Sequence, residues 1–318
     1  MAVNQNIPPH HSNRVFLTEG GLDTTPIFLQ GFDLPSFAPF DLSNDKKGFN
    51  AIQAYFKEYL QFARDHHMGF ILDSPTWRTN MYWIQKLGYP DSALVDINEK
   101  AIDLMLELRE EFRDGMTPVP IGGCIGPCGN GYVKEHMMTV DEAEKYHSGQ
   151  VEIFSQTPVD FISALAINYV EEALGIVRAV NEVDIPVVIS FSLEKNGRLP
   201  SGMNLKEAIN LIDKGVKEPP IYYMVNCAHP LHIIADMPGA SGLQEPWVKR
   251  IRGIRAKATF QSHFEPEGDK ECEFENPVDL AKAYGKLKIQ FQHLNIFGSY
   301  CGTDKEHLMT ITSALGIS

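Results

Sequence analysis

The chain has 318 residues, of which 43% are hydrophobic and 22% are charged, so it is long enough to bury a large core. Its formal net charge of -13 would repel a phosphate backbone, which argues against nucleic acid as a partner. Residues 1–13 lack the basic and apolar regions of a secretion signal, and no stretch of about 18 apolar residues occurs, so we expect a cytoplasmic protein without a membrane partner. The five cysteines are odd in number and scattered, which predicts reduced thiols rather than disulfides.

Short β-branched runs alternate with longer helix-forming stretches from one end of the chain to the other. The eight predicted strands are residues 14–19, 70–74, 119–125, 161–167, 186–193, 222–227, 251–258 and 292–298. The predicted helices are residues 51–66, 97–112, 140–154, 170–181, 205–214, 278–287 and 305–315, and several follow a capping residue: Thr139, Asn204 and Asp304. This alternation favours an α/β fold of the closed type over an open doubly wound sheet. It predicts a single (β/α)8 TIM-type barrel over residues 14–318, after an N-terminal extension of residues 1–13.

The first candidate ligand-binding residues stand at the end of the first predicted strand. Glu19-Gly20-Gly21 follows the apolar run 15–17, so a carboxylate lies beside two glycines that let a ligand approach the backbone. In a barrel of this kind, ligands bind at the carboxyl ends of the strands. A tight turn with a solvated acid is the alternative explanation of the same residues.

A second group of polar and aromatic residues closes the second predicted strand. Asp73 is followed by Thr76, Trp77 and Arg78, and then by Trp83. Aromatic faces near a barrel mouth can hold an onium methyl donor through cation–π attraction, worth about 0.5–2 kcal/mol. Two alternatives stay open: the tryptophans pack under the loop, or Asp73 and Arg78 carry an unrelated chemistry that needs no thiol.

Cysteines follow the sixth and the eighth predicted strands. Cys227 ends one strand and Cys301 follows the other, so the two thiols would meet over the mouth of the barrel. Such a pair is typical of part of a zinc site, because a catalytic zinc takes three protein ligands and lowers the pKa of a bound thiol. Cys124 and Cys128, spaced i, i+4 in a glycine-rich loop, offer a second metal site, although turn geometry explains them as well. Buried cysteines that act as small hydrophobic residues are the alternative throughout.

Taken together, the residues resemble the homocysteine S-methyltransferase family over about residues 14–315. This family includes betaine-dependent enzymes and the homocysteine-binding module of cobalamin-dependent methionine synthase. The landmarks occur in order: Glu19-Gly20-Gly21, Ser74-Pro75-Thr76-Trp77, Ile125-Gly126-Pro127, Ser190-Phe191-Ser192, Asn226-Cys227, Ile254-Arg255-Ala256-Lys257-Ala258 near the family's Gly-Xaa-Asn-Ala segment, and Cys301-Gly302-Thr303. Their order and their positions at strand ends make the resemblance specific.

The resemblance implies a (β/α)8 barrel whose zinc is held by one cysteine after strand six and two adjacent cysteines after strand eight. Homocysteine would bind that zinc through its sulfur and attack a methyl group. Cys227 and Cys301 match two of the ligands, but Tyr300 stands in place of the third. A phenol is a poor soft ligand with a pKa near about 10, so we expect weaker zinc binding, with Cys124, His229 or water as further ligands.

A second departure from the family concerns the amino group of the acceptor. Leu165 and Ala166 stand where many relatives carry a Glu-Thr that binds the amine of homocysteine. Glu19 remains as a carboxylate that can meet a cationic amine. The substrate-binding residues that the resemblance implies are Glu19, Gly20, Thr76, Trp77 and Asn226.

The sequence therefore predicts a cytoplasmic, zinc-dependent S-methyltransferase of methionine biosynthesis. It would move a methyl group from a sulfonium or quaternary ammonium donor to homocysteine or a similar thiol. Its partners would be these two small molecules, and a homo-oligomer is compatible with this interpretation. The alternative hypothesis is a metal-free barrel that binds a small molecule and transfers no methyl group.

Overall fold

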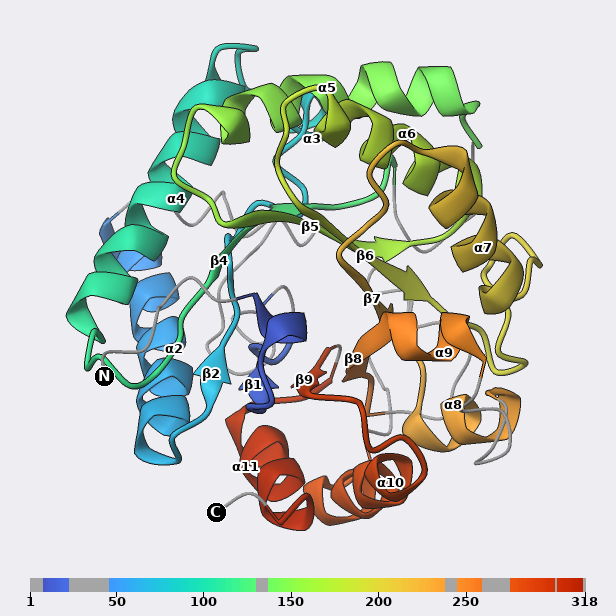
Figure 1. The fold of residues 1–318 in the computed structure, drawn as a ribbon. Coiled ribbons are helices and arrows are strands. Elements are labelled where there is room, and N and C mark those ends of the chain that lie inside the picture. The colour runs from blue at the N-terminus through green and yellow to red at the C-terminus, as the bar shows by residue number, and fades with distance from the viewer. Residues whose placement is uncertain are drawn as a thin grey trace.

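The computed structural model describes residues 8–22, 46–129, 137–237, 245–258, 275–300 and 302–316. Its strands form one parallel sheet in the order β2-β1-β9-β8-β7-β6-β5-β4-β3. They are β1 (Phe16–Leu17), β2 (Gly69–Phe70), β3 (Leu72–Asp73), β4 (Ile121–Ile125), β5 (Phe161–Ile167), β6 (Val187–Ser192), β7 (Tyr222–Asn226), β8 (Ile251–Ala256) and β9 (Ile296–Ser299). Figure 1 shows the strands at the centre of the molecule and the helices in a ring around them.

The sheet closes on itself because its two outer strands belong to one extended segment. Only Ile71 separates β2 from β3. Its N–H donates to the carbonyl of Leu17 (2.8 Å) on one side, and the N–H of Leu72 donates to the carbonyl of Pro120 (2.9 Å) on the other. The two short strands therefore fill one of the eight positions around the barrel. The predicted (β/α)8 barrel is confirmed.

The helices around the sheet begin and end close to the predicted residues. They are η1 (Pro9–His11, a 3-10 helix), α2 (Lys46–Asp65), α3 (Met81–Lys86), α4 (Ala93–Glu111), α5 (Val140–Ser155), α6 (Val170–Asn181), α7 (Leu205–Gly215), α8 (Pro230–Asp236), α9 (Pro246–Arg250), α10 (Pro277–Gln290) and α11 (Lys305–Ala314). Sequence analysis missed α3, α8 and α9. Each has five to seven residues, too few turns to show an amphipathic period.

The three predicted capping residues make the expected hydrogen bonds. Thr139 and Glu142 form a capping box at the start of α5, and Asn204 Oδ1 accepts from the N–H of Glu207 (2.8 Å) at the start of α7. Asp304 caps α11 in the same way. Each cap pairs a backbone donor that the first turn of a helix leaves free. Because these helices follow strand exits, the caps also fix where the loops of the barrel mouth end.

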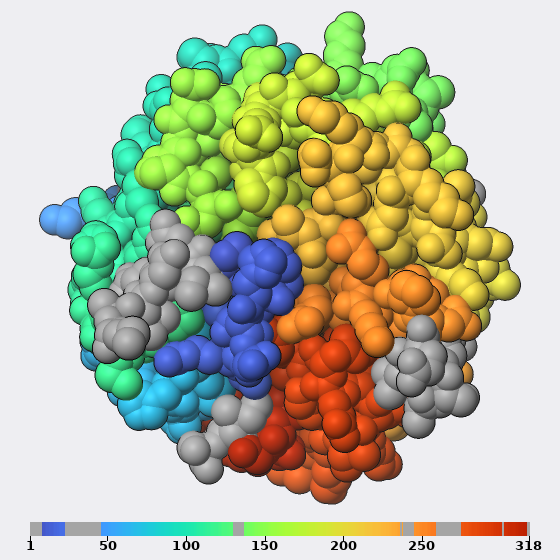
Figure 2. All heavy atoms as spheres, viewed as in Figure 1, coloured from blue at the N-terminus to red at the C-terminus, as the bar shows by residue number. Residues whose placement is uncertain are grey.

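The end of the barrel at which the strands begin is covered by residues 8–14. The buried side chain of Asn295, just before β9, donates from Nδ2 to the carbonyls of Pro9 (2.8 Å), Ser12 (3.1 Å) and Arg14 (3.0 Å). Figure 2 shows the N-terminal part of the chain, in blue, over the centre of the molecule. A ligand therefore has to enter from the opposite end, at which the predicted site residues lie.

Substitutions at two helix glycines, Gly175 and Gly149, distinguish the effect of close packing on stability from that of helix propensity. A Cβ added to Gly175 of α6 would lie 2.5 Å from Ala143 Cβ and 2.6 Å from Glu144 N on α5. Gly175→Ala should therefore lower the free energy of unfolding by about 1–3 kcal/mol, because the two helices have to move apart. A Cβ at Gly149 of α5 would have no atom within 4 Å. Gly149→Ala should raise the free energy of unfolding by about 0.5–1 kcal/mol. Urea unfolding followed by circular dichroism measures both, and a neutral Gly175→Ala would contradict the close packing.

Candidate active site

A buried arginine lies inside the barrel near the carboxyl ends of the strands. Arg255 of β8 is 1% exposed. In the sheet it is in register with Asn226 of β7 and Gly298 of β9. A Cβ at Gly298 would collide with the Thr18 hydroxyl and lie 3.0 Å from Thr18 Cβ, so glycine at this position leaves room for the Thr18 side chain.

Two carboxylates hold the Arg255 guanidinium. Its Nη1 donates to Oδ2 of Asp73, the last residue of β3, at 3.1 Å. Its Nη2 donates to Oε1 of Glu19, two residues after β1. All three side chains are buried. Since an unpaired buried charge is strongly unfavourable, the three groups form one unit that links β1, β3 and β8 across the barrel.

The other oxygen of each carboxylate also accepts hydrogen bonds. Glu19 Oε2 accepts from the hydroxyl of Tyr55 (2.8 Å) and from the N–H of Leu22 (3.0 Å). Asp73 Oδ1 accepts from Ser163 Oγ (2.6 Å). Sequence analysis predicted Glu19 as the partner of a cationic amine. In the structure, a cation of the chain already has this place.

The three groups shift one another's pKa values. Burial raises the pKa of Glu19 and of Asp73 above the ordinary carboxyl values, and the nearby Arg255 opposes this rise. Burial alone would lower the pKa of Arg255, but the two carboxylates outweigh it and raise the pKa of the guanidinium. Arg255 therefore stays charged as the counter-ion of the two carboxylates.

A small cavity opens beside this cluster. Its volume is about 30 Å³, and the residues that line it include Glu19, Asp73, Trp77, Cys124, Leu165, Arg255 and Tyr300. A cavity of this size has room for about two or three water molecules. Three of the predicted site residues, Glu19, Trp77 and Tyr300, thus come together.

The tryptophans at this end of the barrel have cations of the chain as neighbours. The Arg78 guanidinium lies 5.1 Å from a ring centroid of Trp77 and 4.3 Å from one of Trp83. Lys86 Nζ lies 4.4 Å from the Trp83 ring. Both indoles are buried, and Trp77 Nε1 donates to the carbonyl of Leu165 (3.0 Å). An onium donor would have to compete with these cations for the same aromatic faces.

Three other predicted substrate-binding residues make contacts within the chain. A Cβ at Gly20 would lie 2.7 Å from a tyrosine hydroxyl of α2, so only glycine fits there. Thr76 Oγ1 donates to the carbonyl of Cys124 (2.8 Å), and Asn226 Oδ1 accepts from Ser190 Oγ. A role of these three residues in substrate binding stays a prediction.

The first thiol of the predicted zinc site lies at the exit of β7. Cys227 is half-buried and has a φ of 57°, a left-handed conformation that is uncommon for a residue with a Cβ. Its N–H donates to the carbonyl of Arg255 (3.1 Å), which fixes the turn to the neighbouring strand. Backbone strain of this kind clusters at functional sites. Cys301, the second predicted thiol ligand, lies outside the described residues.

Tyr300, the predicted third ligand, packs against the buried cation. Arg255 Cζ lies 5.4 Å from the centroid of the Tyr300 ring. In the ranges that the structure describes, no group of three or more His, Cys, Asp or Glu side chains is placed to hold a metal. A hard phenol beside a permanent guanidinium is a poor ligand for zinc. The described part of the site therefore does not by itself fit the metal that the resemblance implies.

The side chains predicted to complete a zinc shell have separate surroundings. His229 Nε2 is 2.7 Å from Oε2 of Glu275, and its Nδ1 accepts from the N–H of Leu231 (3.3 Å). To bind a metal, this histidine would have to give up one of these bonds. Cys124 lines the small cavity, whereas Cys128 lies in the loop beyond β4, where burial raises the pKa of its thiol.

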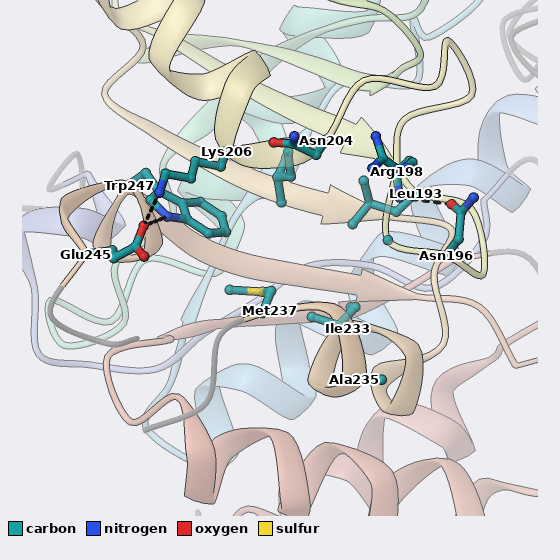
Figure 3. Close-up of a pocket in the computed structure, with 12 residues that line it drawn as sticks. Leu193, Asn196, Arg198, Asn204, Lys206, Ile233, Ala235, Met237, Glu245 and Trp247 are labelled. Atoms are coloured by element: carbon teal, nitrogen blue, oxygen red, sulfur yellow. Dashed lines mark hydrogen bonds and ion pairs between the residues drawn. The ribbon is translucent and has the colours of Figure 1, made fainter. Parts of the chain in front are cut away.

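A larger cavity, of about 610 Å³, lies outside the barrel between α7, α8 and α9. Figure 3 shows Trp247 and Glu245 at one end of it, Arg198 at the other, and Met237 between them. The predicted site residues do not line it, and its lining does not include the ends of β1, β3 or β8. We therefore place the chemistry at the smaller cavity despite its size.

Arg255 is the candidate functional residue that sequence analysis missed. It was included only within the landmark at 254–258. A signal was present, because a charged residue between apolar neighbours in a buried strand needs an ionic partner inside the barrel. The sequence does not show which residues pair with Arg255, because Asp73 and Glu19 lie 182 and 236 positions away.

Comparison with known protein families identifies the family of this chain. The profile described as homocysteine S-methyltransferase matches residues 17–315. The chain belongs to this family. A search of curated proteins gives no significant match. In this member of the homocysteine S-methyltransferase family, none of the described helices is long and apolar enough to cross a membrane.

Solved structures of low sequence identity share the fold of this family member. The metallated form of the homocysteine methyltransferase MmuM from Escherichia coli has a TM-score of 0.73 and 13% identity, over 98% of this chain and 99% of that one. The oxidized form of MmuM also gives 0.73 and 13%, over 95% and 96%. The apo form gives 0.65 and 13%, over 96% of each chain. At such identities the likeness supports the barrel fold alone.

The buried ion cluster predicts a pH-dependent loss of stability when its cation is removed. Arg255→Met should lower the free energy of unfolding by about 3–5 kcal/mol at pH 8, because Glu19 and Asp73 would be left buried without a counter-ion. Their pKa values then rise further in the folded chain. The folded chain therefore binds protons that the unfolded chain releases, and the loss becomes smaller as the pH falls toward the ordinary values of 3.8 and 4.5.

Urea unfolding at pH 8 and pH 5 measures this difference. The matched control is Arg178→Met on α6, whose exposed side chain pairs with Asp141 at 3.1 Å. That variant should change the free energy of unfolding by less than about 1 kcal/mol at both pH values. An equal loss for Arg255→Met at the two pH values would show that the carboxylates do not control its stability.

Proposed function

We propose that this protein is a thiol S-methyltransferase, which moves a methyl group from a sulfonium or quaternary ammonium donor to homocysteine or a similar small thiol. The observation that carries the proposal is the match of the family profile to residues 17–315, which include every strand except the first residue of β1. The position of the small cavity, at the carboxyl ends of the strands, agrees with where such a barrel binds its ligands.

In the proposed reaction the acceptor sulfur attacks the methyl carbon of the donor. A carbon–sulfur bond forms, the bond from the methyl carbon to the donor's sulfonium or ammonium atom breaks, and the thiol proton leaves. The reactive form of the acceptor is its thiolate. Glu19 and Asp73 already neutralise the Arg255 guanidinium, so this cation does not by itself favour the thiolate of an acceptor.

Zinc enters this proposal through the resemblance to the family. When bound, the metal would lower the pKa of a thiol. The residues that the resemblance assigns to it are Cys227, Tyr300 and Cys301. The described donor set does not by itself fit zinc, and the chain carries its own cation, Arg255, in the same region.

The alternative is a metal-free barrel that binds a small molecule without methyl transfer. The contact between Arg255 and Tyr300 favours it, because the residue that replaces a metal ligand serves another cation. In that case Cys227→Ser and Cys301→Ser would leave ligand binding intact, whereas Glu19→Gln or Trp77→Ala would abolish it.

The methyltransferase activity is tested with purified protein, two donors and a thiol panel. We expect methyl thioether formation, detected by mass spectrometry, to depend on both the protein and one donor, either S-methylmethionine as a sulfonium or glycine betaine as a quaternary ammonium. Cys227→Ser should lose turnover, since its thiol stands at the exit of β7. Asn196→Ala, in the larger outer cavity, is the control that should keep it. Absence of any methylated thiol with either donor would refute the proposed function.

The metal is tested separately, by elemental analysis and by competition with a chelator. Tyr300→Cys should bind zinc about tenfold more tightly than the natural protein or better, because a thiolate replaces a hard phenol. Tyr82→Cys, at a partly exposed residue of α3, controls for an added thiol elsewhere. Equal and tight binding by the natural protein would mean that Tyr300 is a competent ligand or that other residues replace it.

A further inference from the structure

We infer that the closed end of the barrel carries a binding site for a small oxyanion of the phosphate type, with Arg252 at its centre. This end lies opposite the candidate active site, and Figure 2 shows residues 8–14, in blue, over the middle of it. The anion would bind on the outside of this end and would not enter the barrel. Such a site is separate from the proposed methyl transfer, and neither depends on the other.

The guanidinium of Arg252, the second residue of β8, has two nitrogens that lack an acceptor. Its Nε donates to Asn295 Oδ1 (3.1 Å), but neither Nη nitrogen has a hydrogen-bond partner among the described residues. Arg252 is partly exposed, and neither Nη is a buried atom, so a ligand can reach both from solution. The N–H groups of a guanidinium form a planar fork that matches two oxygens of a phosphate group. The fork of Arg252 is therefore available to a ligand.

Two other arginines of the barrel show how this chain usually holds a guanidinium. Arg109 Nη1 is 2.7 Å from Oδ2 of Asp160, and Arg250 Nε is 2.9 Å from Oδ2 of Asp213. Both pairs are largely shielded from solvent, where a charge without a counter-ion is unfavourable. In the part of the chain that the structure describes, Arg252 pairs with no carboxylate.

The sequence around Arg252 cannot supply the missing anion. The segments that meet at this place are residues 1–14, 219–235, 246–258 and 280–303. They contain no Asp or Glu, although the whole chain has 41 acidic residues. A counter-ion for Arg252 therefore has to come from solution.

Further cations lie beside Arg252. Lys288, in the last turn of α10, donates from Nζ to the carbonyls of Gln292 (2.8 Å) and Leu294 (2.6 Å). Burial, and then the nearby charge of Arg252, lower the pKa of Lys288. Burial also lowers the pKa of His293, to which both Arg252 and Lys288 contribute. Like charges thus gather at one place, and an anion bound among them would relieve their repulsion.

Two buried polar atoms near Arg252 also lack partners. The ring of His10, in η1, lies 5.6 Å from that of Tyr222, the first residue of β7. His10 Nδ1 and the Tyr222 hydroxyl are buried and have no hydrogen-bond partner among the described residues. Burial lowers the pKa of His10 to about 4 and raises that of Tyr222, and Arg252 is close enough to lower both. Since buried polar groups are normally paired, a group from outside the chain is missing here.

These observations define the chemistry of the ligand. It has to be negatively charged, offer several acceptor oxygens and be small. A tetrahedral oxyanion can give two oxygens to the Arg252 fork and keep others for the neighbouring donors. Free phosphate and the phosphate group of a small monoester share this chemistry. A long polyanion does not suit a chain with a net charge of -13.

Binding of the anion should be linked to protonation of His10. The groups that face this ring are His11, with ring centroids 3.9 Å apart, Tyr222, and the guanidinium groups of Arg250 and Arg252. With a pKa of about 4, His10 is uncharged at neutral pH when no anion is bound. A bound anion favours the charged imidazolium and raises this pKa. By linkage, the anion binds more tightly as the pH falls.

Calorimetric titration of the full chain with sulfate, inorganic phosphate and glycerol 3-phosphate tests the site. We expect saturable binding of about one anion per chain. Comparable affinities for phosphate and glycerol 3-phosphate would identify the group of a phosphate monoester as a ligand, whereas binding of phosphate alone would identify the free ion. No saturable binding of any of the three would overturn the inference.

Sulfate tests the role of His10, because its charge is the same at pH 8 and pH 5.5. Its affinity should rise about threefold or more between these pH values, and His10→Gln should lose this dependence. An equal affinity of the natural protein for sulfate at both pH values would exclude His10 from the site.

Variants at the two cations locate the site. Arg252→Gln should weaken phosphate binding at least tenfold, and Lys288→Gln about threefold, because charge and donors are removed. Arg252→Lys keeps the charge without the fork and should weaken binding severalfold, which decides the case if Arg252→Gln folds poorly. The matched controls are Arg178→Gln and Lys282→Gln, both on exposed side chains. An unchanged affinity in Arg252→Gln with cooperative thermal unfolding, or equal losses in the controls, would refute the site.

Discussion

The pairing of Arg255 with Glu19 and Asp73 is the constraint on which the site depends. A guanidinium inside a barrel is tolerated only with anions at hydrogen-bonding distance, and these come from strands far apart in sequence. The constraint extends to backbone positions. A Cβ at Gly122 would lie 2.6 Å from Ser163 Oγ and would collide with Asp73. Gly122 therefore leaves space for one carboxylate of the ion cluster and for its hydrogen-bond donor.

This cluster changes how the predicted site residues are interpreted. From the sequence, a carboxylate and several aromatic rings at strand ends indicate a pocket for cations. In the structure, Arg255 pairs with Glu19 and faces Tyr300, while Arg78 lies over Trp77. A cation-binding chemistry is present, but the chain supplies its own cations. The residue types could be read from the sequence, whereas their partners depend on contacts that only the closed barrel creates.

The barrel could be predicted from the sequence, because the signals for its strands and helices lie within short segments of the chain. Strands and longer helices carry their periods within some ten residues, and the caps at Thr139, Asn204 and Asp304 sit beside the turns they stabilise. The short helices α3, α8 and α9 were not predicted because their periods are too brief. In the candidate site the prediction brought Glu19, Trp77 and Tyr300 together, as the cavity does. It missed Arg255, because the apolar neighbours of this arginine indicate a buried partner but the partners themselves lie 182 and 236 positions away.

The departures from the family pattern are neighbours in space. The resemblance implies a glutamate at the position of Leu165 and a cysteine at that of Tyr300, and Arg255 is their neighbour. All three line the same cavity, and two of them are in cation–π contact. Independent loss of function would be expected to scatter changes over the barrel and to leave unpaired charges inside it. Here the charge of Arg255 is paired with two carboxylates, and the Tyr300 ring packs against it. The contacts around the cavity are therefore mutually compensated, which argues against a site that has decayed.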